Sequence, residues 1–242
     1  MTGFPLDQVD FESGYAGREL IPGTEVSFQV APWDIGAPQP VVVRLADEGE
    51  FRGAVLDAGC GLGDNAIFLA GRGCAVTGVD GAETALRTAR ERAAARGVEV
   101  DFVHTDVTTF EGVEPRFDTV LDSALYHCLT DEQRTAYAAA LHRVTRPGAR
   151  LHLLCFADVG NEGLGLPMDV SQDDLHAHLS DHWRIRAVEP ADYTMSLTVE
   201  SFAQMGGERM AAMGFTVDPD TVRTDEQGRL LGRMWHLSAD RA

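Results

Sequence analysis

At residues 55 to 63 the chain reads Val55-Leu56-Asp57-Ala58-Gly59-Cys60-Gly61-Leu62-Gly63, an apolar run that leads into three glycines at alternate positions. The run that begins at Ala54 has the length and composition of a buried strand. A helical pattern, GDNAIFLAGRG, begins at Gly63, the last residue of the quoted stretch, and continues to Gly73. Glycines at such a junction let the main chain approach a ligand closely, because they lack a Cβ atom. We therefore expect a strand, a ligand-binding turn and a helix, in that order.

The same alternation of strand and helix continues along the chain. We predict strands over residues 54–59, 75–80, 98–106, 117–123, 151–157, 183–190 and 228–239. We predict helices over residues 41–50, 63–73 and 83–96, from a capping box at Thr130 up to Pro147-Gly148, and from a second capping box at Ser171. Such alternation is typical of an α/β fold whose mostly parallel sheet is covered on both faces. The last strand follows a turn-rich stretch, which favours antiparallel pairing.

Composition limits the partners that the protein can have. The 242 residues include 38 acidic and 20 basic side chains, for a formal charge of −18, which is the wrong sign for neutralising phosphates. No stretch approaches the roughly 20 apolar residues of a membrane span, and the first ten residues show no signal sequence. The four cysteines lack CxxC spacing. We expect a cytoplasmic protein with reduced thiols that binds neither nucleic acid nor membrane.

The glycine loop departs from the dinucleotide-binding pattern. That pattern, G-x-G-x-x-G, would place its third glycine at position 64, where this chain has Asp64. An acid, Asp57, precedes the first glycine. A carboxylate there would repel a pyrophosphate but would attract the ammonium and sulfonium groups of S-adenosylmethionine. The loop therefore favours S-adenosylmethionine as the cofactor, with a NAD-dependent oxidoreductase as the alternative.

Further aspartates end the next three predicted strands. Asp80 follows Asp57 by 23 residues, near the spacing at which an acid reaches ribose hydroxyls in nucleoside-binding βαβ units. Asp106 is placed to accept a hydrogen bond from an adenine amine, with Val107 beside the ring, and Asp122 ends the fourth strand. Aspartates also favour strand-to-helix junctions as caps, which is the alternative explanation for each one singly.

These segments resemble the class I S-adenosylmethionine-dependent methyltransferases. VLDAGCGLGDNAIFLA and VTGVD look like the first two motifs of that class, and the similarity covers about residues 30 to 190. PWDIGAPQP, FDTVLDSALYHCLTDEQR, LHRVTRPGARLHLLCF and VSQDDLHAHLSDHWRI resemble a bacterial branch of heterocyclic toxin methyltransferases, more distantly related to thiopurine and thiol methyltransferases. The Asn-Pro-Pro-Tyr run of enzymes that methylate nucleobase or glutamine nitrogens is replaced by Asp122-Ser123-Ala124-Leu125.

The resemblance implies a Rossmann-like, seven-stranded sheet with an antiparallel last strand. It assigns cofactor contacts to seven positions, with Val107 beside them as an adenine neighbour: Trp33, Asp57, Gly59, Gly61, Asp80, Asp106 and Asp122. A tryptophan face beside a sulfonium is attractive, since the ring quadrupole draws cations. Trp33 could equally anchor the N-terminal segment on the core, and the two roles are compatible.

Methyl transfer requires the acceptor atom to face the methyl carbon opposite sulfur, at about 3 to 3.5 Å. The segment after the fourth strand lies at that edge of the sheet, so Asp122 and His127 are the predicted catalytic residues, His127 as a base or as a hydrogen-bond partner of the acceptor. The alternative is that His127 packs the following helix. His176, His178 and His182 lie among aspartates and indicate a solvated helix face, so no metal is predicted.

We predict one methyltransferase domain over residues 1–242, with an N-terminal cap segment (1–50), a cofactor-binding core (51–193), a helical Met-rich insertion (194–217) and a last strand (218–242). We expect a monomer or homodimer that methylates O, N or S of a small aromatic or heterocyclic acceptor, in detoxification or specialised metabolism. A non-catalytic S-adenosylmethionine-binding protein is a further alternative. Met195, Met205, Met210 and Met213 could form an adaptable cover over the acceptor, as part of a lid, or could simply fill a helix–sheet interface.

Overall fold

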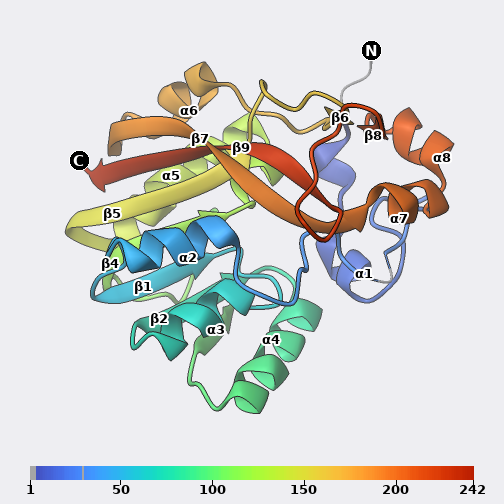
Figure 1. The fold of residues 1–242 in the computed structure, drawn as a ribbon. Coiled ribbons are helices and arrows are strands. Elements are labelled where there is room, and N and C mark those ends of the chain that lie inside the picture. The colour runs from blue at the N-terminus through green and yellow to red at the C-terminus, as the bar shows by residue number, and fades with distance from the viewer. Residues whose placement is uncertain (1–3, 29) are drawn as a thin grey trace.

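The computed structural model describes residues 4–28 and 30–242 and has a seven-stranded sheet at its centre (Figure 1). The order across the sheet is β3-β2-β1-β4-β5-β9-β7. The strands are β1 (Ala54–Ala58), β2 (Ala75–Asp80), β3 (Asp101–His104), β4 (Phe117–Ser123), β5 (Thr145–Phe156), β7 (Trp183–Thr198) and β9 (Arg229–Arg241). The predicted α/β fold class is confirmed.

Only β9 runs against the other strands of this sheet, as the turn-rich stretch before it predicts. β9 is antiparallel to β5 and to β7, whereas the pairs β1–β2, β1–β4, β2–β3 and β4–β5 are parallel. Pairing of β9 with β5 stops at Phe156 and Met234, but pairing with β7 continues to Thr198 and Arg229. The β7–β9 ribbon therefore overhangs the sheet at the end where β5 finishes.

Helices cover both faces of the sheet. One apolar cluster joins the sheet to α2 (Pro40–Asp47), α3 (Asp64–Gly71) and α4 (Glu83–Arg96), and the opposite one joins it to α5 (Asp131–Val144) and α6 (Gln172–Leu179). The capping box at Thr130 begins α5, and Gly97, in the left-handed conformation, ends α4. None of the described helices is both long and apolar enough to cross a membrane.

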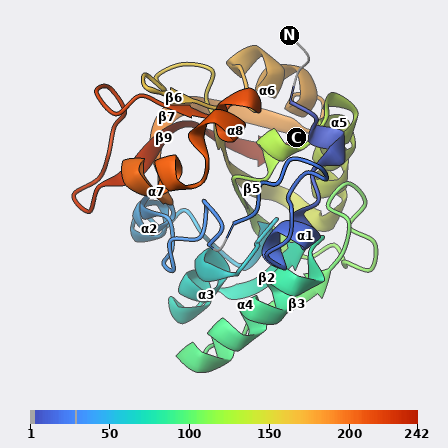
Figure 2. The same ribbon diagram turned by 90° about the vertical axis from the view of Figure 1, so that its right-hand side faces the viewer.

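A third apolar cluster lies beyond the strand ends, where distant segments meet. It contains the N-terminal η1 (Leu6–Gln8) and α1 (Phe11–Tyr15) regions, the overhanging ribbon, α7 (Val199–Gln204), α8 (Gly207–Ala212) and the small sheet of β6 (Leu164–Gly165) and β8 (Thr216–Val217). Figure 2 looks onto this edge and shows α1 beside α4, with α7 and α8 to the left. The first and last quarters of the chain thus enclose the same space.

Some predicted boundaries are wrong. Residues 194–217 are not one helix: Thr194–Thr198 extend β7, because Tyr193, Met195 and Leu197 alternate into the third cluster, and the pair Gly206-Gly207 separates α7 from α8. The third strand is only Asp101–His104. α5 ends at Val144, before Pro147, and the Ser171 cap is a single hydrogen bond from Asp174 rather than a full box.

Candidate active site

A cavity of about 880 Å³ opens at the carboxyl ends of the parallel strands. One half is lined by the turns after β1, β2 and β3 and by residues 123–129 after β4. The other half is lined by apolar side chains of the third cluster. Single ligand pockets span about 300 to 1,000 Å³, so this cavity lies near the upper end of that range.

The glycine loop forms one wall of the cavity. Gly59, Gly61 and Gly63 all have left-handed φ angles, of 68°, 51° and 82°, which L side chains adopt only at a cost. A Cβ on Gly59 would lie 2.8 Å from the Leu125 side chain, and one on Gly61 would lie 2.7 Å from the Tyr15 hydroxyl. The loop is therefore closed to larger residues and leaves its backbone facing the cavity.

Asp57 presents an unpaired carboxylate oxygen to this space. The residue is 1% exposed and lines the cavity, and its Oδ2 has no hydrogen-bond partner. Burial, together with the charges of Asp122 and Asp80, raises the pKa of Asp57 to about 8. An orphaned buried oxygen of this kind fits a cationic ligand, since a cation would satisfy it and offset the desolvation of the carboxylate. The free Asp57 oxygen thus suits the ammonium of S-adenosylmethionine, which would donate a hydrogen bond to it.

Asp80 lies at the end of β2 and keeps part of its carboxylate free. Its Oδ2 accepts the Gly61 N–H at 2.8 Å and its Oδ1 accepts the Ala82 N–H at 2.8 Å. Each oxygen can accept a second hydrogen bond, so the group can receive two hydroxyls. Burial raises the pKa of Asp80, while these backbone hydrogen bonds lower it. Asp80 therefore shapes the glycine loop and remains placed to bind a ribose.

Asp106 and Val107 lie in the turn after β3, on the rim of the same cavity. Asp106 is exposed, and its Oδ1 accepts hydrogen bonds from the Thr108 N–H and hydroxyl. Val107 is 9% exposed and packs in the apolar core. Both therefore line the same cavity as Asp80.

Asp122 departs from its predicted contact with the ligands. It is fully buried and is not among the described residues that line the cavity. Its Oδ1 accepts the Leu125 and Tyr126 N–H groups and its Oδ2 accepts the Tyr137 hydroxyl at 2.9 Å. The Asp122 carboxylate, near the end of β4, is thus used to fold the turn that follows the strand. We therefore regard Asp122 as a positioning residue and not as a catalytic one.

Trp33 lies in a strap, residues 31–39, that crosses the cavity. Its Nε1 donates to the Tyr15 hydroxyl at 2.8 Å, and its ring packs edge-on against Phe11, Tyr15 and Phe28. Trp33 lines the cavity as well, so the anchoring and wall roles coincide.

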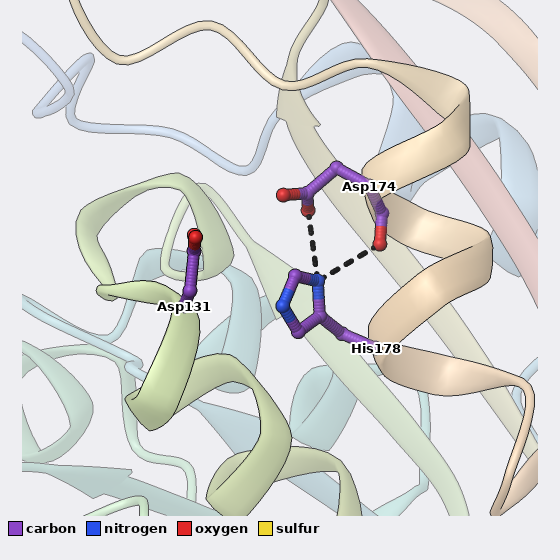
Figure 3. Close-up of side chains that lie close together, drawn as sticks. All are labelled: Asp131, Asp174 and His178. Carbon is purple, nitrogen blue, oxygen red and sulfur yellow. Dashed lines mark hydrogen bonds and ion pairs between the residues drawn. The ribbon is translucent and has the colours of Figure 1, made fainter.

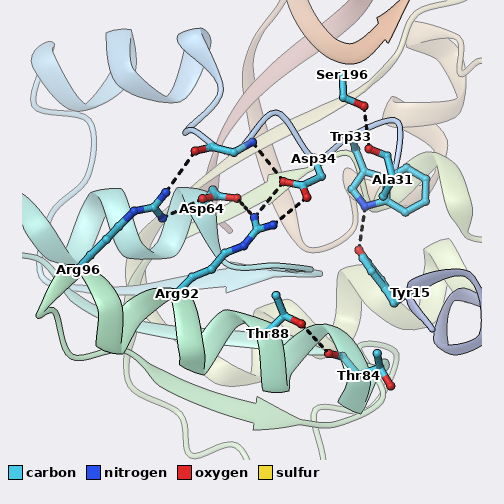
Figure 4. Close-up of polar contacts among 11 residues, drawn as sticks. Tyr15, Ala31, Trp33, Asp34, Asp64, Thr84, Thr88, Arg92, Arg96 and Ser196 are labelled. Atoms are coloured by element: carbon cyan, nitrogen blue, oxygen red, sulfur yellow. Dashed lines mark hydrogen bonds and ion pairs between the residues drawn. The ribbon is translucent and has the colours of Figure 1, made fainter. Parts of the chain in front are cut away.

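Polar contacts hold the strap from two sides (Figure 4). Asp34 receives two hydrogen bonds from Arg92 of α4, at 2.9 and 2.8 Å, and Arg92 also contacts Asp64 at the start of α3. On the other side, Ser196 of β7 donates to Ala31 O and Pro32 O. The strap thus joins the glycine-loop side of the cavity to the β7–β9 ribbon, a link for which the sequence offers no motif.

His127 lies where the two halves of the cavity meet. It is 3% exposed, belongs to the turn η2 (Tyr126–Cys128), and stacks on Phe156 with a ring-centroid distance of 4.3 Å. Its Nδ1 accepts the Phe156 N–H at 3.3 Å. Burial, and secondly the charge of Arg134, lower the pKa of His127 to about 3. The imidazole is therefore neutral at physiological pH.

The apolar half of the cavity was only partly foreseen. Of the four methionines predicted as a cover, Met195 and Met210 line the cavity, whereas Met205 and Met213 pack behind it. The other apolar lining residues come, apart from Phe156, from segments without any motif and include Phe4, Leu20, Phe28, Leu164, Met168, Tyr193, Phe202, Phe215 and Leu230. None of the described lining residues is lysine or arginine. The chamber is thus apolar and lacks a cation.

Away from the cavity, Asp131, Asp174 and His178 come close enough to suggest a metal site (Figure 3). The Asp174 carboxylate, however, already accepts hydrogen bonds from the Tyr126 hydroxyl at 3.0 Å and from Arg134 at 2.7 Å. Arg134 brings a positive charge to the same point. The cluster is therefore explained as an ion-paired contact between α5 and α6, and His178 belongs to it.

Comparison with known proteins defines the class. A family model described as a methyltransferase domain matches residues 55–148. The 2-heptyl-1-hydroxyquinolin-4(1H)-one methyltransferase of Mycobacteroides abscessus is 35% identical over 206 residues, which are 83% of this chain and 87% of that protein. The chain belongs to the class I methyltransferases, and its cofactor is S-adenosylmethionine; the predicted alternatives of a NAD-dependent oxidoreductase and of a non-catalytic binding protein are set aside.

Two solved structures extend the likeness beyond the cofactor core. One comes from work on the conversion of a disulfide bond into a thioacetal group during echinomycin biosynthesis. Its TM-score is 0.74 at 33% identity, and the match covers 96% of this chain and 90% of the chain in that structure. The other is the 1,6-didemethyltoxoflavin-N1-methyltransferase of Burkholderia thailandensis with 1,6-didemethyltoxoflavin and S-adenosylhomocysteine bound, with a TM-score of 0.56 and 19% identity, covering 84% and 77%. This second likeness concerns the fold alone.

Proposed function

We propose that the protein methylates an oxygen, nitrogen or sulfur atom of a small, flat, mainly apolar aromatic or heterocyclic molecule. The observation that carries the proposal is the single cavity that joins the glycine loop to an apolar chamber whose described lining contains no lysine or arginine. Phosphates and polycarboxylates need such cations for binding. One relative is named as a 2-heptyl-1-hydroxyquinolin-4(1H)-one methyltransferase and another as a probable thiol methyltransferase, which supports a small-molecule acceptor.

The roles of the site residues follow from their places. Asp57, Gly59 and Gly61 hold the methionine part of S-adenosylmethionine, Asp80 holds the ribose, and Asp106 with Val107 holds the adenine. Trp33 closes the cavity above the sulfonium, which supplies the activated methyl group. The protein orients the acceptor opposite that group and excludes water from it.

The same proposal extends to the setting of the reaction. Residues 1–242 act as one domain, with the cap, core, insertion and last-strand division described above. The formal charge of −18 argues against nucleic acid as a partner. We place the protein in the cytoplasm, as a monomer or homodimer, in detoxification or specialised metabolism.

A methylation assay tests the proposal. The protein is incubated with S-adenosylmethionine and a panel of hydroxyquinolones, phenols, thiols and azoles, and products are identified by mass spectrometry beside release of S-adenosylhomocysteine. Turnover of at least one flat apolar member is expected, and phosphorylated or dicarboxylated analogues should stay unmethylated. Cofactor binding by calorimetry without turnover of any member would overturn the acceptor assignment while leaving the cofactor site intact.

A further inference from the structure

His127 is held in one orientation at the junction of the two cavity halves. Phe156 fixes the ring twice, by stacking on it with an interplanar angle of 26° and by donating its backbone N–H to Nδ1. Both contacts come from the end of β5, which is paired on both sides, with β4 and with β9. The imidazole ring therefore cannot flip and exchange the positions of Nδ1 and Nε2 without losing the hydrogen bond from the Phe156 N–H.

This hydrogen bond decides which nitrogen carries the proton. A backbone N–H can only donate, so Nδ1 must be the unprotonated nitrogen that accepts it. In a neutral imidazole the other nitrogen, Nε2, then bears the hydrogen. To act as a base through Nε2, the ring would need its proton on Nδ1, where it would face the Phe156 N–H. The geometry thus leaves Nε2 as a donor.

The surroundings oppose the imidazolium form as well. Arg134 of α5 is the charged group whose field reaches the ring, and the ring itself is buried. Other titratable groups on the cavity wall also keep their protons: burial raises the pKa of the Cys128 thiol to about 12, and burial raises the pKa of the Tyr193 hydroxyl. Neither the Cys128 thiol nor the Tyr193 hydroxyl is thus a proton acceptor near neutral pH.

We propose that His127 is a fixed Nε2–H hydrogen-bond donor to the acceptor, and that the acceptor is a weak acid which enters the cavity already ionised, such as an N-hydroxy heterocycle, an acidic phenol or a thiol. This inference rests on the proposed function and deepens it. The acceptor proton leaves to solvent before binding. A lone pair of the oxygen or sulfur anion then forms the bond to the methyl carbon while the carbon–sulfur bond breaks towards sulfur, so the anion and the sulfonium become two neutral products.

The chamber is consistent with a singly charged anion and with no greater charge. Without lysine or arginine in its described lining, the cavity offers an acceptor anion neutral hydrogen-bond donors such as His127, and the sulfonium supplies the full positive charge. One negative charge is balanced there by one positive charge. A second would remain uncompensated in an apolar space, which is costly.

The first experiment reads the proton directly and needs no acceptor. Nitrogen-15 NMR of the protein with S-adenosylhomocysteine bound, assigned by loss of the signals in His127→Gln, should show a protonated Nε2 and an unprotonated Nδ1. The ring should not titrate between about pH 5 and 8. A proton on Nδ1, or formation of the imidazolium in that range, would overturn the donor assignment whatever the outcome of the methylation assay.

The second experiment uses the pH dependence of kcat/KM. Substituted 1-hydroxyquinolin-4(1H)-ones and thiophenols whose own pKa values lie below, near and above neutrality serve as acceptors. The pH of half-maximal kcat/KM should follow the pKa of each acceptor, in the wild type and in His127→Gln alike. A limb at one fixed pH for all acceptors, absent from His127→Gln, would identify His127 as a base and refute the inference.

A pair of variants separates donation from packing. His127→Gln keeps one acceptor for the Phe156 N–H and one donor for the cavity, whereas His127→Phe keeps only the stacking. We expect kcat/KM to fall roughly 10- to 100-fold in His127→Phe, the usual effect of losing a hydrogen bond to a charged group, and to be largely restored in His127→Gln. Equal losses in both variants, with S-adenosylhomocysteine affinity and melting temperature unchanged, would contradict donation.

Discussion

The two halves of the cavity are built in different ways. The cofactor half comes from one continuous stretch, residues 54–129, and uses backbone groups, glycines and aspartates at strand ends. The acceptor half comes from three distant parts of the chain, the N-terminal 40 residues, the segment after β5, and the β7–β9 ribbon with α7 and α8. It uses apolar side chains almost throughout. A fixed cofactor is thus met by local chemistry, and a variable acceptor by long-range packing.

This contrast has a physical origin. Hydrogen bonds to a nucleoside and a methionine need defined directions, and a strand-to-helix turn supplies them within a few residues. An apolar acceptor needs area and shape, which any set of side chains can supply if the fold brings them together. Changes that act on local geometry should therefore affect the cofactor half most strongly.

Gly59→Ala should have the largest effect. Its φ of +68° costs an L residue about 1 to 2 kcal/mol, and the new Cβ would meet Leu125 Cβ at 2.8 Å, which overpacks the turn by about 1 to 3 kcal/mol. We expect a loss of roughly 2 to 5 kcal/mol in the free energy of unfolding and a marked fall in S-adenosylhomocysteine affinity. Chemical denaturation and calorimetry measure the two quantities.

Gly73→Ala is the matched control. Gly73 follows α3 with a φ of +90°, and a Cβ there would meet nothing within 4 Å. The substitution should lower the free energy of unfolding only by the penalty of the left-handed φ angle and should leave cofactor affinity unchanged. If Gly59→Ala and Gly73→Ala proved equally mild, the glycine loop would not be the tight cradle described here.

Asp80→Ala should weaken cofactor binding next most strongly. The carboxylate orders the loop through Gly61 and Ala82 and is placed to bind two ribose hydroxyls. Losing hydrogen bonds to a charged group costs about 1 to 3 kcal/mol, or roughly 5- to 150-fold in the dissociation constant for S-adenosylhomocysteine. Asp101 lies on the neighbouring strand β3, and Asp101→Ala, which removes only its exposed ion pair with Arg116, is the control and should leave the affinity unchanged. Unaltered affinity in both would mean that the ribose binds elsewhere.

The difference between the halves also explains what could be predicted from the sequence. Asp57, Gly59, Gly61, Asp80 and Asp106 are recognisable because their spacing follows from βαβ geometry, and the structure brings them to one cavity. Asp122 fits the same spacing, but its oxygens are taken by Tyr137 and by the turn it folds, and no sequence pattern distinguishes a ligand-binding aspartate from a turn-forming one.

The acceptor side could not be assembled in the same way. Phe28, Phe156 and Phe202 meet in one chamber because the ribbon overhangs β5 and the N-terminal segment folds back. Such contacts depend on tertiary arrangement rather than on periodicity. The interpretation of residues 194–217 as one helix was wrong for a related reason: the apolar pattern of Tyr193, Met195 and Leu197 suits a strand only once β9 is present to pair with it.

Cofactor binding should depend on pH through Asp57. The pKa of Asp57, about 8 in the folded protein, lies above its ordinary value of 3.8 because of burial and neighbouring acids. The protonated form is thus favoured on folding, so this contribution to stability is complete below about pH 4 and is lost as the pH rises through 8. A bound ammonium reverses the preference and ionises the group.

The pH dependence of cofactor binding follows from this change in the protonation of Asp57. Below pH 8 binding should release a proton from Asp57, and affinity for S-adenosylhomocysteine should rise with pH by up to about tenfold per unit before levelling off. Calorimetry in buffers of different ionisation enthalpy counts the protons, and Asp57→Asn should abolish the dependence. Affinity that falls with rising pH in this range would place the cation away from Asp57.

The smallest predicted effect is the one that couples the two halves. Arg92 holds Asp34 through two hydrogen bonds, and the same strap holds β7 through Ser196 and through Gln39, whose side chain bonds the Thr194 N–H and carbonyl. Because Arg92 is partly exposed, Arg92→Gln should cost only about 1 kcal/mol. The loss should nevertheless reach both sites, lowering S-adenosylhomocysteine affinity and raising the KM of the acceptor.

Arg96 provides the comparison for this coupling, one turn further along α4. It pairs with Asp64 and with the Gly36 carbonyl but has no contact with Asp34, and its side chain is 44% exposed against 26% for Arg92. Arg96→Gln should change neither the S-adenosylhomocysteine affinity nor the acceptor KM beyond about twofold, as expected of an exposed ion pair. If Arg92→Gln altered cofactor affinity alone, the strap would belong to the cofactor half only. A change in both the S-adenosylhomocysteine affinity and the acceptor KM would mean that residues 31–39 hold the cofactor half and the acceptor half in position relative to each other.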